Sequence, residues 1–318
     1  MSDADSYSIR YRNSPDGSKS ASALVNSDER VRSSPPCLIT WNELEEWQKD
    51  NEYIVGGYRR VRHNWMACIE SVYAYLHNET INIHSHLWAA ILVAYLCTTF
   101  YGNHIKPFAP VSTWVDSAVF LTFLISAIAC LSLSASFHAF GCHSEKVASR
   151  CHAYDYSGII ILIVGSFVPA IYYGFFCDNF HKYLYLTIIF LGGLGAAYIV
   201  LSPEYSKPTH RGARTAVFIA LGVSAVVPVS HLIASLGLHE LVINMGLGWL
   251  LVMGALYIIG ALLYANRIPE RFAPGRFDYF FASHQIFHVC VVLAILAHYR
   301  CVIIVSAYRF SASGACGT

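Results

Sequence analysis

The stretch SHQIFHVCVVLAILAHY, residues 283–299, opens the last long apolar run of the chain. With the residues up to about 306 it is long enough to cross a bilayer as a helix, which takes about 20 residues. It also carries His284 and His288, whose spacing of four places both imidazoles on one face of a helix. Ionisable groups are rare within membrane spans and usually face the interior of a helix bundle or a cavity. The stretch therefore predicts a spanning helix that carries a polar function on its inward face.

The composition of the whole chain is typical of a polytopic membrane protein. Its 318 residues are 55% hydrophobic and 13% charged, whereas a soluble globular protein has about 25% charged residues. Charges are frequent up to about Arg62 and sparse beyond it. A net charge of +1 gives no support to nucleic-acid binding. None of the ten cysteines belongs to a CxxC pair, so zinc-finger and thioredoxin-like sites gain no support either.

Seven apolar runs predict an all-α fold, a seven-transmembrane helix bundle. Glycines in the fourth and sixth runs predict close helix contacts, and Pro169 and Pro228 predict kinks within the third and fifth. The runs lie at 85–101, 115–137, 156–177, 183–201, 215–235, 246–265 and 281–306, and the glycines are Gly193, Gly195, Gly254 and Gly260.

The chain divides into four predicted regions. The first is polar, with almost no apolar periodicity, and predicts a disordered tail. In the second, the sequence TWNE from Thr40 has the form of a capping box and predicts a short helix that Gly56 and Gly57 end. A second helix is predicted where an apolar face recurs at helical spacing from Trp65 to Leu76. We expect this second helix on the membrane surface or against the bundle. The regions are a disordered tail at 1–36, cytosolic juxtamembrane helices at 37–83, the seven-helix transmembrane domain at 84–306 and a short C-terminal tail at 307–318.

Lysine and arginine counts in the short loops predict the orientation in the membrane, because cytosolic loops carry an excess of both. The loops after spans one, three and five contain only Lys106 and Lys182. The basic loops lie on the side of the N-terminal segment, so the N-terminus is predicted to be cytosolic and the C-terminus extracellular or lumenal. The loops after spans two, four and six contain Lys146, Arg150, Lys207, Arg211, Arg214, Arg267, Arg271 and Arg276.

This orientation brings five polar residues to one depth. Ser134 and His138 lie at the cytosolic end of the second span, and Asp155 lies at the start of the third. His284 and His288 lie at the start of the seventh, on the same side. Three imidazoles with an open fourth position form the ligand set of a catalytic zinc site. Asp155 would then hold a water molecule on the metal or accept its proton.

Polar residues within the spans can also have purely structural roles. Ser134 could bond the carbonyl of residue 130, and Asp155 could be a helix N-terminal charge. We expect structural roles for His231 and His298, which fall near the outer ends of their predicted spans without a partner at matching depth. The grouping of four ionisable residues at one depth favours the metal site.

The cytosolic start of the first span holds a second polar group. Glu79, Asn82 and His86 could support the metal ligands or pack between helices, and the presence of three ligands elsewhere favours structural roles. We expect structural roles for His77 and His84 as well.

Ordered motifs along the chain are similar to those of a known family. The chain resembles the progestin and adipoQ receptor family, in particular its adiponectin-receptor branch and fungal relatives, with a more distant similarity to haemolysin III. The similarity covers residues 53 to about 300, essentially the whole predicted membrane domain. The motifs are HNETINIHSHLW (77–88), SASFH (134–138), CHSEKV (142–147), DYSGI (155–159), GSFVP (165–169), RIPERFAPGRFD (267–278) and SHQIFHV (283–289).

The resemblance implies a seven-helix bundle with a cytosolic N-terminus and a bound Zn²⁺. The positions that match the zinc ligands of the family are His138, His284 and His288. The family aspartate, which contacts zinc through water, matches Asp155, and the family serine matches Ser134. The first 52 residues and the tail after about 300 match no motif, which leaves open whether an extracellular protein ligand binds the outer face.

The function that the resemblance implies is a zinc-dependent amidase acting on a membrane lipid, ceramide or another sphingolipid or fatty-acid derivative. Asp155 would act as general base and Ser134 would stabilise the oxyanion. The alternative is a receptor or regulator of lipid and zinc homeostasis in which the zinc is structural. A di-iron desaturase would need an HxxHH box, which the chain lacks, and a transporter gains no support from an inverted repeat. The predicted location is the plasma membrane or an internal membrane such as the endoplasmic reticulum.

Overall fold

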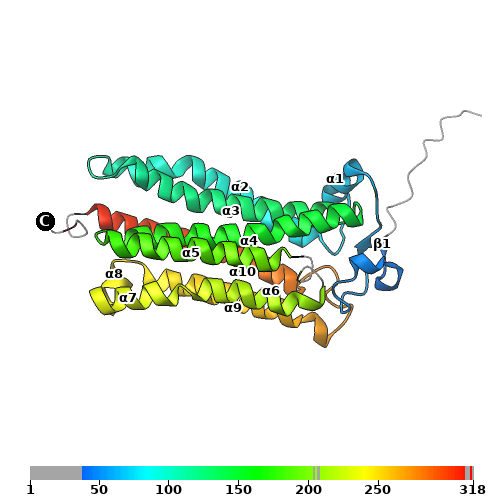
Figure 1. Cartoon of the computed structure of the whole chain (residues 1–318). Helices are drawn as coiled ribbons and strands as arrows, with labels where there is room; N and C mark the ends of the chain where they lie inside the picture. Colours follow the sequence, from blue (N-terminus) through cyan, green and yellow to red (C-terminus); the bar gives the residue numbers. More distant parts are fainter. Residues whose placement is uncertain (1–37, 203–204, 206–207, 312–315, 317–318) are drawn as a thin grey trace, which may run out of the picture. The chain divides into compact units, whose positions relative to one another are not determined.

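The computed structural model describes residues 38–202, 205, 208–311 and 316, and this part of the chain is almost entirely helical (Figure 1). Seven of its helical segments are long and apolar enough to cross a membrane. The prediction of an all-α bundle with seven spans is therefore confirmed. The predicted disordered tail at 1–36 lies outside the described residues.

The spanning helices form a closed ring. Each span packs against the next one along the chain, and the seventh span packs against the first. The seventh span also contacts the third. They are α2 (Thr80–Phe100, prolonged by the turns Tyr101–Ile105 and Lys106–Phe108), α3 (Trp114–Phe140), α4 (Glu145–Gly174), α5 (Asn179–Val200), α6 and α7 (Arg211–Val223 and Val226–Leu236), α9 (Leu247–Asn266) and α10 (Ser283–Phe310).

Short elements connect these helices. Strands β1 (Leu38–Ile39) and β2 (Tyr58–Arg59) pair antiparallel, and α1 (Trp65–Ala74) and α8 (Leu238–Ile243) are short helices. The 3-10 turns are Trp41–Glu43, Glu46–Gln48, Pro208–His210 and Glu270–Phe272.

The segment before α1 is only partly as predicted. The capping box is present, because Glu43 accepts from the backbone N–H of Thr40 at 2.9 Å and the Thr40 side chain caps the turn in return. The prediction of a helix after the capping box is wrong, since the turn ends at Glu43 and the chain returns to β2. Tertiary pairing of β1 with β2 takes the place of the helix.

Helix α1 confirms the predicted helix but turns its apolar face outward. Trp65 and Tyr73 are largely exposed, whereas Cys68 and Ser71 are buried. The buried side packs against α3, where the Cys68 sulfur lies 3.6 Å from the sulfur of Cys142. An exposed aromatic and aliphatic face on a short helix is typical of a helix that lies in the membrane interface.

The two prolines have different effects. Helix α4 continues through Pro169, whereas the fifth span is interrupted between Val223 and Val226. Pro228 has no N–H to give the carbonyl of Ser224, four residues earlier, and its ring crowds that carbonyl. The interruption at this position is the expected consequence.

Two of the four predicted glycine contacts are present. A Cβ on Gly193 would lie 2.6 Å from Val164 of α4, and one on Gly260 would lie 2.8 Å from Cys290 of α10. Gly195 and Gly254 have open space around them, so the prediction is wrong there. The closest approach is a glycine that was not singled out, Gly165 of α4, whose Cβ would lie 2.2 Å from the Ser126 oxygen of α3.

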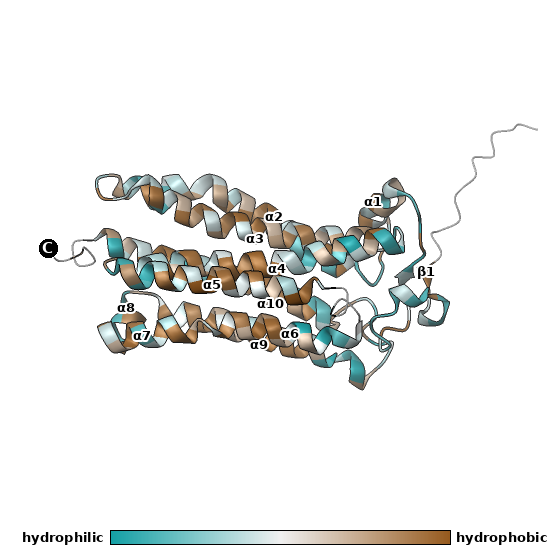
Figure 2. Ribbon diagram, viewed as in Figure 1, coloured by the Kyte–Doolittle hydropathy of each residue, from teal (hydrophilic) through white to brown (hydrophobic). Residues whose placement is uncertain are grey.

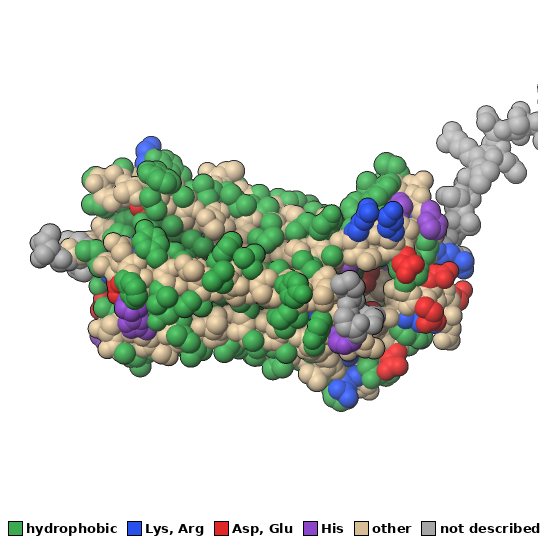
Figure 3. Space-filling model, viewed as in Figure 1, with side chains coloured by type: hydrophobic (Ala, Val, Ile, Leu, Met, Phe, Trp, Pro, Cys, Tyr) green, Lys and Arg blue, Asp and Glu red, His purple; other side chains and the backbone are tan. Residues whose placement is uncertain are grey.

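Hydropathy is distributed along the bundle in bands. Figure 2 shows apolar residues along the middle of the helices and hydrophilic residues at their ends. In the space-filling view of Figure 3, charged side chains gather at the two ends, and apolar side chains cover much of the surface between them. This pattern suits a bundle whose middle is surrounded by lipid.

Candidate metal centre

Three histidines from two helices meet inside one end of the bundle. His138 lies in the last turn of α3, and His284 and His288 lie in the first turns of α10. The ring centroids of each pair are 4.8 Å apart, and one nitrogen from each ring lies within 4.8 Å of the others. Among the described residues, this is the one group of three or more potential ligands with metal-binding spacing. The three predicted ligands are therefore brought together.

Glu79, the residue before α2, orients the His138 ring. Its carboxylate oxygen lies 2.7 Å from His138 Nδ1 and also accepts from the Asn82 side chain at 2.6 Å. Burial disfavours the charged carboxylate, but the contact with His138 outweighs it, so the pKa of Glu79 lies below its usual value. An ionised Glu79 can only accept, so it favours a ring proton on Nδ1 of His138, and the lone pair of Nε2 is the one that could bind a metal.

His288 is oriented in the same way from α2. Its Nδ1 lies 3.1 Å from the carbonyl oxygen of Asn82 and 3.3 Å from the hydroxyl of Ser85. Because a carbonyl can only accept, Nδ1 carries the proton, and the lone pair of Nε2 is left to bind a metal. The ring of His86 stacks on that of His288 with centroids 3.7 Å apart. Glu79 and Asn82 thus contact the ligand histidines directly, whereas the sequence favoured structural roles for them.

These donors fit a metal ion of the zinc type. The Nε2 of His138 is buried and has no hydrogen-bond partner within the described part of the chain. A buried polar atom without a partner is unfavourable, and coordination would satisfy it. Imidazole nitrogens are ligands that zinc binds readily. The cluster could therefore hold a metal ion, with the rings of His138 and His288 already oriented by Glu79 and α2.

The buried Arg59 of β2 holds the end of α3 in place. Its guanidinium donates to the carbonyls of His138 at 2.5 Å and Ala139 at 3.0 Å, and to the Ser71 hydroxyl at 2.8 Å. These carbonyls belong to the last helical turn, which has no N–H partners of its own, and a cation there is favourable. Arg59 therefore fixes the backbone that carries a metal ligand.

Glu270 plays a similar part at the start of α10. This fully buried carboxylate accepts from the Ser283 backbone N–H at 2.7 Å, from the Ser283 hydroxyl, and from Asn51 at 3.1 Å. A carboxylate at a helix N-terminus satisfies free N–H groups and interacts favourably with the helix dipole. The loop that contains RIPERF thus anchors the turn from which His284 projects.

Asp155 and Ser134 lie beside the cluster. Both are buried, Ser134 one turn before His138 on α3 and Asp155 on α4. The Ser134 hydroxyl lies next to the Asp155 carboxylate. Both residues line the same cavity as His284 and His288. The structure brings all five predicted site residues together, and the catalytic roles of Asp155 and Ser134 stay predictions.

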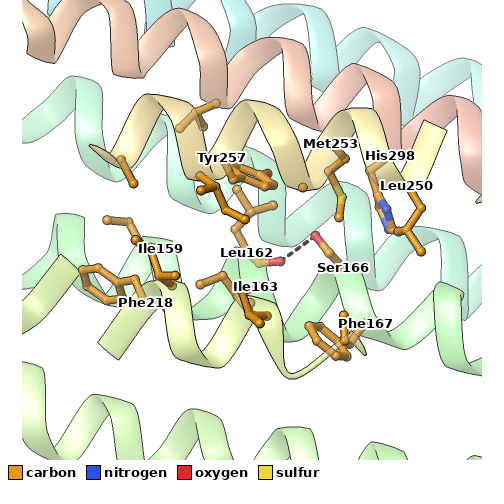
Figure 4. Close-up of a pocket in the computed structure, with 18 of the residues that line it drawn as sticks. Ile159, Leu162, Ile163, Ser166, Phe167, Phe218, Leu250, Met253, Tyr257 and His298 are labelled. Carbon is orange, nitrogen blue, oxygen red and sulfur yellow. Dashed lines mark hydrogen bonds between the residues drawn. The ribbon is translucent and has the colours of Figure 1, made fainter. Parts of the chain in front are cut away.

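The cavity extends from the histidines toward the opposite end of the bundle. Its volume is about 600 Å³, and its walls come mainly from α3, α4, α6, α7, α9 and α10. Most of the residues that line it are aliphatic or aromatic (Figure 4). An elongated apolar cavity that ends at a polar group is suited to a lipid chain with a polar head.

A disulfide joins Cys177, which follows α4, to Cys316, which follows α10. It lies beyond the end of α4 that is distant from Asp155. This pair could not be predicted from the sequence, because 139 residues separate the two cysteines and only the fold brings them together.

The chain is similar to one family over most of its length. A family model described as "Haemolysin-III related" matches residues 74–299. The "Progestin and adipoQ receptor-like protein 1" of Caenorhabditis elegans is 40% identical over 265 residues, and the "Adiponectin receptor protein" of Drosophila melanogaster is 38% identical over 269 residues. These matches cover 82% and 85% of this chain but only 59% and 60% of the two relatives, so the chain spans about three fifths of their length.

An ADIPOR-like receptor of Saccharomyces cerevisiae matches more completely. It is 38% identical over 264 residues, which are 83% of this chain and 82% of the yeast protein.

Proposed function

Because the chain belongs to the haemolysin III-related family and is an adiponectin-receptor-like membrane protein, we propose that it is a zinc-dependent hydrolase of a lipid amide, of the ceramidase type. One arrangement supports the proposal more than any other. Three imidazoles, two of them oriented by hydrogen bonds, lie at the end of an apolar cavity whose wall also carries a buried carboxylate and a buried hydroxyl.

His138, His284 and His288 would hold the zinc ion. A zinc ion held by three histidines supplies Lewis acidity, which polarises a carbonyl and lowers the pKa of water to about 7. Glu79 and Asn82 would keep the ligand nitrogens pointed at it, as their contacts with Nδ1 of His138 and His288 require.

Asp155 and Ser134 would carry out the proton transfer and charge stabilisation. Asp155 would take a proton from the attacking water as the water oxygen bonds to the amide carbon, and would deliver that proton to the nitrogen as the C–N bond breaks. Ser134 would donate a hydrogen bond to the carbonyl oxygen as negative charge develops there. The products are a fatty acid and a free amine.

The cavity supports a substrate with a long apolar chain. Its volume of about 600 Å³ lies in the range of small-molecule sites, and its apolar walls favour acyl chains over water-soluble amides. Ceramide, or another sphingolipid with an amide-linked acyl chain, has such a chain, and its amide bond would lie at the polar end of the cavity.

The second candidate is a receptor or regulator in which the metal is structural. The names of the relatives favour it, because the fly and yeast proteins are called receptors and the worm protein is called receptor-like. A structural zinc site is usually closed by four protein ligands, whereas a catalytic site keeps one position open. The group of three histidines favours the open site. Binding of a protein ligand at the outer face is compatible with either function.

The orientation that we propose places the N-terminal segment and the metal centre on the cytosolic side. The loop charges support it. The Cys177–Cys316 disulfide supports it independently, because disulfides persist in oxidising compartments such as the extracellular space or a secretory lumen. The opposite end of the bundle would face that compartment, whether the host is the plasma membrane or the endoplasmic reticulum.

The test of the hydrolase is an Asp155→Asn variant of the purified protein, with ceramide turnover followed by mass spectrometry. The amide keeps the shape but cannot act as a base, so we expect turnover to fall about 100-fold or more while zinc content is unchanged. Glu52→Gln, which removes an exposed carboxylate, is the matched control. Full turnover in the Asp155→Asn protein, or no turnover in the zinc-loaded parent, would count against the hydrolase and favour the receptor.

A further inference from the structure

The middle of the cavity contains a second polar group, well away from the metal centre. Figure 4 shows the cavity wall in this region, where the labelled residues are apolar apart from Ser166 of α4, Tyr257 of α9 and His298 of α10. None of these three is needed for the chemistry described above. Polar side chains inside an apolar cavity call for an explanation, because their burial is unfavourable unless they are hydrogen-bonded.

His298 is the clearest case. Its side chain is 1% exposed, and its ring packs edge-on against Phe123 with centroids 4.7 Å apart. Neither ring nitrogen has a hydrogen-bond partner among the described residues. The backbone of Ser166 is close enough to interact with the ring, but no contact to either nitrogen has the geometry of a hydrogen bond. Since a neutral imidazole has one donor and one acceptor nitrogen, at least one of them requires a partner that the described protein does not supply.

The metal centre cannot supply this partner. His298 lies ten residues after His288 on the same helix, which corresponds to about 15 Å along the axis. The prediction that His298 lies near the outer end of its span is also wrong, because α10 continues to Phe310 and places it near the middle of the helix. A lipid whose reacting end lies at the histidine cluster would reach this point with the interior of its chain.

Ser166 complements His298. Its hydroxyl donates to the Leu162 carbonyl at 2.7 Å, as the dashed line in Figure 4 shows, so its proton is already used. The serine oxygen can still accept a hydrogen bond. A hydroxyl placed between the two would donate to the Ser166 oxygen and accept from a ring N–H of His298.

We propose that His298 and Ser166 form a subsite for a hydroxyl group on the buried chain of the bound lipid, with Tyr257 on the adjoining wall. The chemical class of ligand is a long-chain lipid that carries a hydroxyl within its chain, at a distance from the headgroup. The subsite deepens the proposed function, because it rests on a lipid lying in the cavity with its polar end at the metal centre. It would make the protein selective between lipids that share a headgroup.

The test measures binding, so that it does not depend on turnover. Purified full-length protein in nanodiscs is titrated with pairs of fatty acids of equal length, one plain and one hydroxylated, across a series of hydroxyl positions. At the position that reaches His298, we expect the hydroxylated member to bind about tenfold more tightly, the effect of one well-placed buried hydrogen bond. Hydroxyls close to the carboxylate should give no such preference.

Three variants assign the preference to the subsite. His298→Phe should abolish it, and His298→Gln, which keeps a donor and an acceptor, should restore part of it. Met253→Leu changes the same wall without changing its polarity and should leave the preference intact. Equal affinity for both members at every position, in folded protein that binds them, would overturn the proposal and leave His298 hydrated by water alone. So would a preference that survives His298→Phe.

Hydrolysis of the matching amides, assayed separately, distinguishes this proposal from the proposed function. Selective binding without hydrolysis would refute the hydrolase and retain the subsite, whereas hydrolysis without selective binding would do the reverse.

Discussion

Glu79 determines how His138 presents itself to a metal ion. Its carboxylate occupies Nδ1 of the ring at 2.7 Å, and Asn82 holds the carboxylate from the other side. A carboxylate behind a ligating histidine fixes the tautomer and raises the basicity of the nitrogen that binds the metal. The affinity of the site should therefore depend on a residue that does not itself contact the ion.

Replacing Glu79 by Gln tests this dependence. The amide keeps the size of the side chain but loses its charge, so we expect zinc affinity to fall about 10- to 100-fold. Competition with a chromophoric chelator measures the change. Glu70→Gln, on the exposed side of α1, is the control and should leave the affinity unchanged. Parent-like affinity in the Glu79→Gln protein would show that the contact is merely structural.

The ligands could be predicted from the sequence, and most of their supports could not. The positive-inside count places Ser134, His138, Asp155, His284 and His288 at one depth, and that is where the fold brings them together. The sequence also places Glu79 at this depth, but depth alone does not say which side chain faces Nδ1 of which ring. Arg59 and Glu270 act on helix ends, and their roles depend on loops that have no periodic pattern.

At the scale of the helices, the closest helix contact that depends on a glycine is the one between α3 and α4. Gly165 lies where any side chain would overlap the Ser126 hydroxyl and its Cβ, at 2.2 and 2.5 Å. This pair of helices carries His138 and Asp155, so the contact fixes the separation of a metal ligand from the predicted base.

Gly165→Ala should therefore force α3 and α4 apart. Overpacking of this kind typically costs about 1–3 kcal/mol, and we expect a lower thermal midpoint together with weaker zinc binding. Gly195→Ala is the matched control, because a Cβ there meets nothing within 4 Å. A thermal midpoint equal to that of the control would mean that the helices are not in contact at this position.

The glycines also show why the helices and their contacts could be predicted only in part from the sequence. Hydrophobic run length predicts the seven spans well, because the bilayer fixes the length. It does not distinguish a glycine at a helix contact, such as Gly193, from one that faces outward, such as Gly195. Nor does it predict that the fifth span is interrupted near Pro228 whereas the third continues through Pro169.

At the scale of the whole molecule, the described helices close into a ring with the metal centre near one end and the disulfide near the other. The proposed orientation assigns the first end to the cytosol. It makes a specific prediction for the two bonded cysteines.

Cys177 and Cys316 should react with a membrane-impermeant maleimide only after reduction, and only from the side opposite to an N-terminal tag. The reason is that a disulfide is stable on the oxidising side of a membrane. Labelling of intact cells or sealed vesicles, followed by peptide mapping, measures this. A Cys177→Ser variant, which leaves Cys316 without its partner, should be labelled without reduction. Labelling from the same side as the tag would reverse the orientation.

The most direct test of the central claim is the metal content of the purified protein, measured by inductively coupled plasma mass spectrometry. We predict about one zinc ion per chain in the parent protein, the same in a control that lacks the exposed His239 (His239→Ala), and almost none when His284→Ala and His288→Ala are combined. A folded double variant that keeps the zinc content of the parent, or a folded parent that binds no metal when zinc is supplied, would contradict the account.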